Sequence, residues 1–183
     1  MFEISRLTVE HLRSGCVTDK ALPRFGFAVR SDRAGAKLVA AQLKVGDWET
    51  ALGDEAQKGT VYAGAALRPF TTYSVKLTAT DDAGETAYAE TTFETGRMGT
   101  AWKAQWITDG SYKFTEKKVS PVPMVFRKSI QTKKPVAWAR LYATAMGIYE
   151  VELDGKKLGS QYFAPGFTSY KSQLQYQTYD VTE

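Results

Sequence analysis

Apolar side chains recur at every second position along much of this chain, and no other feature constrains its fold as strongly. No stretch keeps apolar residues at the helical spacing i, i+3, i+4 and i+7 for three turns. A two-residue period places alternate side chains on opposite faces of a strand. The sequence therefore predicts an all-β fold, and its 183 residues suffice for one large or two small domains.

The clearest alternation lies in the first half of the chain. Strands are predicted over residues 25–29 and 39–45, and in the second of these Val39 and every second residue after it are expected to face inward. Residues 73–79 form a third predicted strand. The small and polar residues 81–84 then predict a hairpin turn into the next strand.

Tyr73 opens one of these strands and follows Leu67 and Pro69. This arrangement is typical of a tyrosine corner, in which the Tyr hydroxyl bonds to upstream backbone and fixes a crossing between sheets. The sequence predicts a fibronectin type III-like, that is immunoglobulin-like, β-sandwich over residues 1–97. In this interpretation Tyr73 specifies the fold and is not a catalytic residue.

Small and polar residues follow this sandwich and predict a linker over residues 98–106. Trp102 and Trp106 lie in the linker. Because each indole ring buries a large apolar area, we expect these two side chains to pack the two domains against each other.

Residues 107–183 are predicted to form a second β-sandwich. Strands are expected over residues 124–130 and 136–145, and Asp154-Gly155 is the dipeptide favoured in two-residue type I′ hairpins. Only about four or five strands are expected from Met124 onward, fewer than a closed sandwich or jelly roll uses. We therefore expect a partial jelly-roll-like sandwich, truncated within the fold.

Composition excludes several classes of protein. Cys16 is the only cysteine, which excludes an internal disulfide and a cysteine metal cluster. The start of the chain lacks a signal-peptide pattern, and eighteen consecutive apolar residues occur nowhere. We accordingly expect a cytoplasmic protein that does not associate with membranes.

The net charge is +4, with the basic excess in the second half of the chain. A nucleic-acid surface would combine arginines with aromatic side chains. Here the basic residues are mostly lysines near prolines, so we expect a solvated loop and no nucleic-acid partner. They are Lys113, Lys117, Lys118, Arg127, Lys128, Lys133 and Lys134.

The sequence offers little for catalysis. His11 is the only histidine, and a pair with Cys16 would lack the third group and the oxyanion hole that nucleophilic catalysis needs. No phosphate-binding loop, metal-ligand set or cofactor motif is present. Carboxylates are close in sequence at Asp81-Asp82, Glu150/Glu152 and Asp54-Glu55, but each pair is expected to be solvated. We predict no catalytic residue, no metal and no cofactor.

Trp138, Arg140 and Tyr142 are expected on one face of the strand over residues 136–145, about 7 Å apart by the strand repeat. An aromatic platform beside a guanidinium could stack on a sugar ring and bond to its hydroxyls. The same face could instead be the buried side of the sandwich, or the contact with whatever follows Glu183. The sequence leaves these three interpretations open.

Short motifs in a fixed order along the chain resemble the N-terminal region of bacterial α-L-rhamnosidases, family 78 of the glycoside hydrolases. Each motif is weak alone, and their order and spacing together carry the resemblance. In the first half they are Pro23-Arg-Phe-Gly-Phe27, Ser31-Asp-Arg-Ala-Gly35, Ala40-Ala-Gln-Leu-Lys-Val45, Val61-Tyr-Ala-Gly64 and Phe93-Glu-Thr-Gly96. In the second half they are Ala139-Arg-Leu-Tyr142, Leu153-Asp-Gly155, Ala164-Pro-Gly-Phe167 and Tyr176-Gln-Thr-Tyr-Asp-Val181.

The resemblance implies a parent enzyme that hydrolyses terminal α-L-rhamnosides with two carboxylates. Family members carry these carboxylates in a later (α/α)6 barrel, and no helical pattern for such a barrel occurs here. This chain is thus expected to be a non-catalytic accessory fragment that braces the missing barrel. Expected partners are that C-terminal catalytic domain, a rhamnose-containing glycan, and a second copy through exposed strands. The alternatives are a self-standing carbohydrate-binding module and a structural or adhesive fibronectin-type tandem.

Overall fold

The computed structural model describes residues 1–53, 59–108, 110 and 123–182. All the regular secondary structure within these residues is β-strand, which confirms the predicted all-β class. The chain divides into two compact units, Met1–Ala101 and Trp102–Glu183. The described part holds no helix long and apolar enough to cross a membrane. Lys113, Lys117, Lys118 and the Asp54-Glu55 pair lie outside the described residues.

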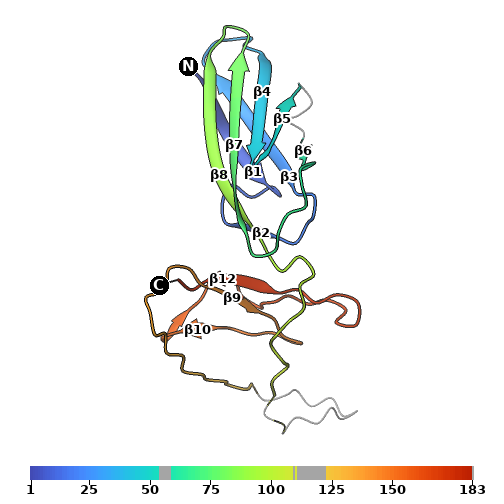
Figure 1. Ribbon diagram of the computed structural model, residues 1–183, viewed down its shortest axis with the longest axis vertical. Coiled ribbons are helices and arrows are strands. Elements are labelled where there is room, and N and C mark those ends of the chain that lie inside the picture. The colour runs from blue at the N-terminus through green and yellow to red at the C-terminus, as the bar shows by residue number, and fades with distance from the viewer. Residues whose placement is uncertain (54–58, 109, 111–122, 183) are drawn as a thin grey trace. The chain divides into compact units, whose positions relative to one another are not determined.

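The first unit is a sandwich of two sheets, visible as two layers in Figure 1. One sheet has the strand order β1-β3-β6 and the other β2-β8-β7-β4-β5. β2 runs parallel to β8, and the other pairings are antiparallel. The strands are β1 (Phe2–Val9), β2 (Cys16–Thr18), β3 (Arg24–Ser31), β4 (Leu38–Val45), β5 (Trp48–Leu52), β6 (Thr60–Val61), β7 (Thr72–Asp81) and β8 (Thr86–Thr95).

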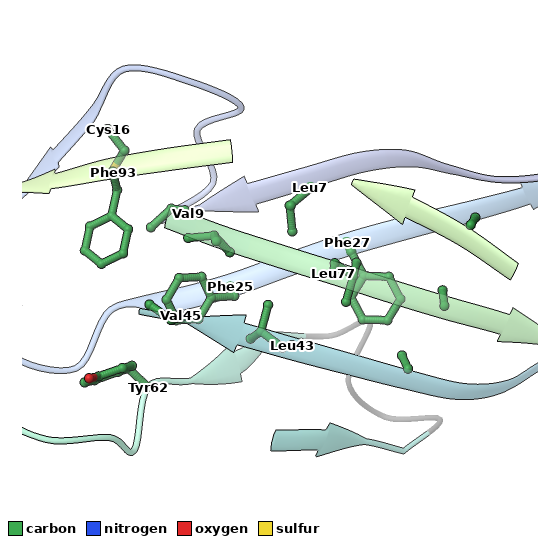
Figure 2. Packing of buried hydrophobic residues seen from close by; sticks show 14 of the residues in the cluster. Leu7, Val9, Cys16, Phe25, Phe27, Leu43, Val45, Tyr62, Leu77 and Phe93 are labelled. Atoms are coloured by element: carbon green, nitrogen blue, oxygen red, sulfur yellow. The ribbon is translucent and has the colours of Figure 1, made fainter. Parts of the chain in front are cut away.

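Side chains from both sheets fill the space between the layers (Figure 2). Phe25 of β3 packs edge-on against Phe93 of β8, with ring centroids 6.0 Å apart. Tyr73 of β7 stacks on the same ring at 5.4 Å. Leu77 is also buried in this core. The strands predicted over residues 25–29 and 73–79 are therefore confirmed, and each contributes side chains to the core.

Val39 departs from the prediction for β4. Its side chain is 59% exposed, whereas Ala41, Leu43 and Val45 are buried as expected. The pairing of β4 with β7 shifts register between Leu38 and Ala40. A bulge of this kind interrupts the alternation of faces, so the inward pattern begins only after it.

The predicted tyrosine corner is confirmed. The backbone N–H of Arg68 donates to the Tyr73 hydroxyl at 2.9 Å. Nearby, the Thr95 hydroxyl donates to the Arg68 carbonyl at 2.6 Å and accepts the N–H of Thr71 at 3.0 Å. These bonds fix the segment before β7 to the end of β8.

The second unit contains two small antiparallel sheets in its described part, β9 with β12 and β10 with β11. The strand predicted over residues 124–130 is wrong, since those residues form no strand, and Val125 is 94% exposed. The strand predicted over residues 136–145 is shortened to β9, because its ladder with β12 spans only four residue pairs. The strands are β9 (Arg140–Ala143), β10 (Glu152–Leu153), β11 (Lys156–Lys157) and β12 (Gln177–Asp180).

The hairpin between β10 and β11 follows the sequence prediction. Asp154 and Gly155 have φ angles of 49° and 78°, so both central positions lie in the left-handed region that a type I′ turn requires. The N–H of Leu158 donates to the carbonyl of Val151 at 2.9 Å and extends the pairing beyond the two short strands.

Candidate functional site

The pairing of β9 with β12 assembles the surface that contains the predicted sugar-binding residues. Arg140 lies opposite Asp180, and Tyr142 lies opposite Thr178. Because side chains alternate along a strand and opposed residues share a face, these four side chains lie on one side of the sheet. With Trp138 and Tyr176 they form what we call the β9/β12 face.

Trp138 and Arg140 are in direct contact. The Arg140 guanidinium carbon lies 5.0 Å from the centre of the Trp138 ring, a cation–π geometry. Its Nη1 also lies 2.7 Å from Oδ1 of Asp180 and donates to the Ala139 carbonyl at 3.1 Å. The Arg140 side chain is only 11% exposed and its guanidinium is bound by these partners, whereas Trp138 is 50% exposed.

Asp180 completes this group as a carboxylate. The Thr182 hydroxyl and N–H donate to Asp180 at 2.6 and 3.1 Å. These hydrogen bonds, with the charge of Arg140, hold the pKa of the Asp180 carboxyl below its ordinary value. Since the Asp180 side chain is 63% exposed, an ionised acceptor stands beside the Trp138–Arg140 pair at neutral pH.

Tyr142 has different neighbours. Its ring centroid lies 6.1 Å from that of Tyr176, and the Tyr176 ring lies 5.9 Å from Trp102 in a T-shaped contact. The structure thus divides the predicted platform, with Trp138 and Arg140 in one contact and Tyr142 in an aromatic cluster. Trp102 and Trp106 are 42% and 59% exposed, and their packing between domains stays a prediction.

The opposite side of the same sheet carries a polar network that sequence reasoning missed. The Tyr149 hydroxyl lies 3.2 Å from the Tyr179 hydroxyl and 3.0 Å from Oε1 of Gln177. Burial and the bond to Tyr179 raise the pKa of Tyr149, so the phenol stays neutral and acts as a structural group. Tyr149 lies outside both strands, 28 residues before Gln177 and 30 before Tyr179, so the local sequence pattern could not predict this contact.

Among the carboxylates considered for acid–base chemistry, Asp81, Asp82 and Glu150 have cationic partners, and the prediction that Asp81 is solvated is wrong, since it is 1% exposed. Arg33 Nη2 donates to Asp81 Oδ2 at 2.9 Å and also contacts Asp82. Glu150 binds Lys157 Nζ at 2.6 Å. Over residues 1–53, 59–108, 110 and 123–182, no three His, Cys, Asp or Glu side chains gather in a way that could hold a metal ion.

Cys16 lies in the core of the first unit. It is 3% exposed, and burial raises the pKa of its thiol. A thiol in this environment stays protonated and unreactive at neutral pH. The structure therefore gives Cys16 a packing role.

The chain thus consists of two β units, and the first of them is an immunoglobulin-like sandwich. Residues 4–99 match the family model described as "Rha78A-like, N-terminal immunoglobulin domain". Residues 134–183 match the model described as "Alpha-L-rhamnosidase N-terminal domain". The chain therefore belongs to the α-L-rhamnosidases of glycoside hydrolase family 78 and corresponds to their N-terminal region.

Individual relatives agree with this assignment. An α-L-rhamnosidase of Streptomyces avermitilis is 57% identical over 49 residues, which are 27% of this chain and 5% of the relative. One from Formosa agariphila is 31% identical over 116 residues, 61% of this chain and 12% of the relative. The solved structure of the α-L-rhamnosidase from Dictyoglumus thermophilum superimposes with a TM-score of 0.82 at 27% sequence identity. The match covers 98% of this chain and 23% of the Dictyoglumus chain. The chain thus spans a small part of the proteins it matches.

Proposed function

We propose that this chain is the non-catalytic N-terminal accessory part of an α-L-rhamnosidase, an enzyme that hydrolyses terminal α-L-rhamnosides. In this role its two β units support a C-terminal (α/α)6 catalytic barrel. The observation that carries the proposal is the match to two family models that are described as N-terminal domains. The curated relatives are α-L-rhamnosidases, and the chain corresponds to between 5% and 16% of their length.

The second unit supports a bracing role through its lack of enclosure. The buried apolar cluster lies in the first unit. Within the described part of the second unit, Ala164 and Pro165 are the only buried residues. Large exposed apolar areas on a soluble protein mark interaction surfaces, so a unit of this kind gains stability when a larger domain covers it.

Deletion tests this role in the enzyme that the gene encodes. Removing residues 1–183 is expected to lower both the yield of soluble enzyme and the temperature at which rhamnosidase activity is lost. A deletion that leaves the inactivation temperature unchanged contradicts a supporting role.

A second proposed function is binding of a rhamnose-containing glycan at the β9/β12 face. It is favoured by the half-exposed Trp138 ring beside the exposed Asp180 carboxylate. The indole can stack on the apolar face of a sugar ring, while Asp180 accepts bonds from its hydroxyls. Arg140, already bound to Asp180, holds both groups in place.

Tryptophan fluorescence tests the second function. Rhamnose is expected to quench the chain saturably, and Trp138→Ala is expected to abolish the response. Trp106→Ala is the matched control, since Trp106 is similarly exposed, and should keep the response. A flat titration of the unaltered chain contradicts glycan binding.

A further inference from the structure

The β9/β12 face carries two opposite charges that differ in their access to solvent. The Arg140 side chain is 11% exposed, whereas the Asp180 side chain is 63% exposed. The guanidinium lies over the Trp138 ring and contacts both Asp180 and the Ala139 carbonyl. The positive charge is therefore largely withdrawn from solvent, and the charge that a ligand meets first is the carboxylate.

The two oxygens of the Asp180 carboxylate differ in their partners. Oδ1 lies 2.7 Å from Nη1 of Arg140 and accepts the hydroxyl and the N–H of Thr182 at 2.6 and 3.1 Å. Over the residues that the structure describes, no group donates to Oδ2. The contacts at Oδ1 hold the carboxylate in one position, and Oδ2 keeps its capacity to accept a hydrogen bond from a ligand.

Trp138 adds apolar surface and a donor beside this carboxylate. The residue is 50% exposed although the Arg140 guanidinium lies over its ring. Within the described part of the chain, the indole N–H of Trp138 donates to no acceptor. The three residues thus combine open apolar surface with one unpaired donor and one unpaired acceptor.

These groups suit an uncharged sugar better than an acidic one. A sugar hydroxyl can donate to Oδ2 while the apolar face of the ring stacks on the indole. A carboxylate on the sugar has no proton to donate and is repelled by Asp180, which is ionised at neutral pH because its pKa is lowered. For two unit charges about 4 Å apart in water, this repulsion corresponds to about a fivefold loss of affinity.

We propose that the β9/β12 face binds uncharged sugars and discriminates against sugars that carry a carboxylate, with Oδ2 of Asp180 as the hydrogen-bond acceptor. The inference rests on the second proposed function, glycan binding, and adds the chemical class of the ligand. Arginine alone would favour the opposite class, because guanidinium groups bind carboxylates. The ion pair with Asp180 reverses that preference.

Tryptophan fluorescence titrations with rhamnose and with galacturonate, at equal ionic strength, test this preference. We expect the unaltered chain to bind rhamnose more tightly than galacturonate by about fivefold or more. Asp180→Asn removes the carboxylate and frees the Arg140 guanidinium, so the preference should disappear or reverse. Glu150→Gln is the matched control, because it removes one negative charge from a side chain that is 57% exposed, and it should keep the preference.

Salt provides a second measurement that needs no variant. Dissolved ions screen the repulsion between a bound anion and Asp180. Raising the salt concentration from about 0.05 M to about 0.5 M should therefore tighten galacturonate binding and leave rhamnose binding unchanged.

Three results overturn the proposal. They are galacturonate binding as tight as rhamnose binding in the unaltered chain, a preference for rhamnose that persists in Asp180→Asn, and a preference that salt does not reduce. In each of these cases glycan binding at the face still stands. If rhamnose leaves the fluorescence of the unaltered chain unchanged, glycan binding itself fails, and the selectivity fails with it.

Discussion

Gly64 lies so close to an aromatic pair that no side chain fits. A Cβ atom there would lie 2.5 Å from the Tyr62 hydroxyl and 2.7 Å from Cβ of Trp48. The Tyr62 hydroxyl donates to the Ala65 carbonyl at 2.9 Å, so it cannot move without losing that bond. Gly64→Ala is expected to lower the free energy of unfolding of the first unit by about 1–3 kcal/mol, the usual cost of overpacking.

Urea denaturation measures this loss. Gly53→Ala is the control, because a Cβ atom at Gly53 meets nothing within 4 Å, and its effect should stay within about 0.5 kcal/mol. Equal stability of the two variants would show that the Trp48–Tyr62 pair moves aside at no cost.

Asp81 makes the first unit sensitive to acid. Burial opposes ionisation, but hydrogen bonds from Arg33 and from the N–H groups of Glu85 and Ala83 outweigh it and hold the pKa of Asp81 below its ordinary 3.8. A carboxyl whose pKa is lowered by folding stabilises the fold above its unfolded-state pKa, and this stabilisation disappears as pH falls through the folded-state pKa. The free energy of unfolding should therefore decrease as the pH is lowered below about 4.

The Asp81→Asn variant isolates this contribution. It is expected to be less stable than the unaltered chain at pH 7 and to approach it as the pH falls toward 2. Denaturation curves recorded across this range that stay a constant distance apart would rule out Asp81 as the source of the acid sensitivity.

At the scale of single elements, the β10–β11 hairpin depends on Gly155. With a φ angle of 78°, an alanine at this position should destabilise the turn by roughly 1–2 kcal/mol. The expected result for Gly155→Ala is faster amide exchange of Leu158, whose N–H bonds to Val151. Asp154→Asn is the control, since Asn tolerates the left-handed region, and unchanged exchange in Gly155→Ala would contradict the turn assignment.

Elements whose pattern is local could be predicted from the sequence, and those that depend on a distant partner could not. Residues 73–79 alternate because both neighbouring strands and the opposite sheet enclose them. The exposure of Val39 follows from a bulge in its pairing with β7, which alternation within one strand cannot reveal. Likewise, Arg140 and Tyr142 could be placed on one face, but the contact with Asp180 requires the register of β12.

For the molecule as a whole, the small two-stranded sheet of β9 and β12 predicts self-association. In the part of the chain that the structure describes, these two strands pair only with each other. Unpaired strand edges are templates for pairing with another chain. We expect light scattering to show dimers that increase with protein concentration, and a strictly monomeric species at high concentration would contradict this.

We propose that this chain belongs to a rhamnosidase and does not itself perform the hydrolysis. The decisive assay compares hydrolysis of an aryl α-L-rhamnoside by the purified 183-residue chain with hydrolysis by the full enzyme that the gene encodes. We expect turnover by the full enzyme and only the buffer rate with the chain. Turnover by the chain above the buffer rate, or none by the full enzyme, would contradict it.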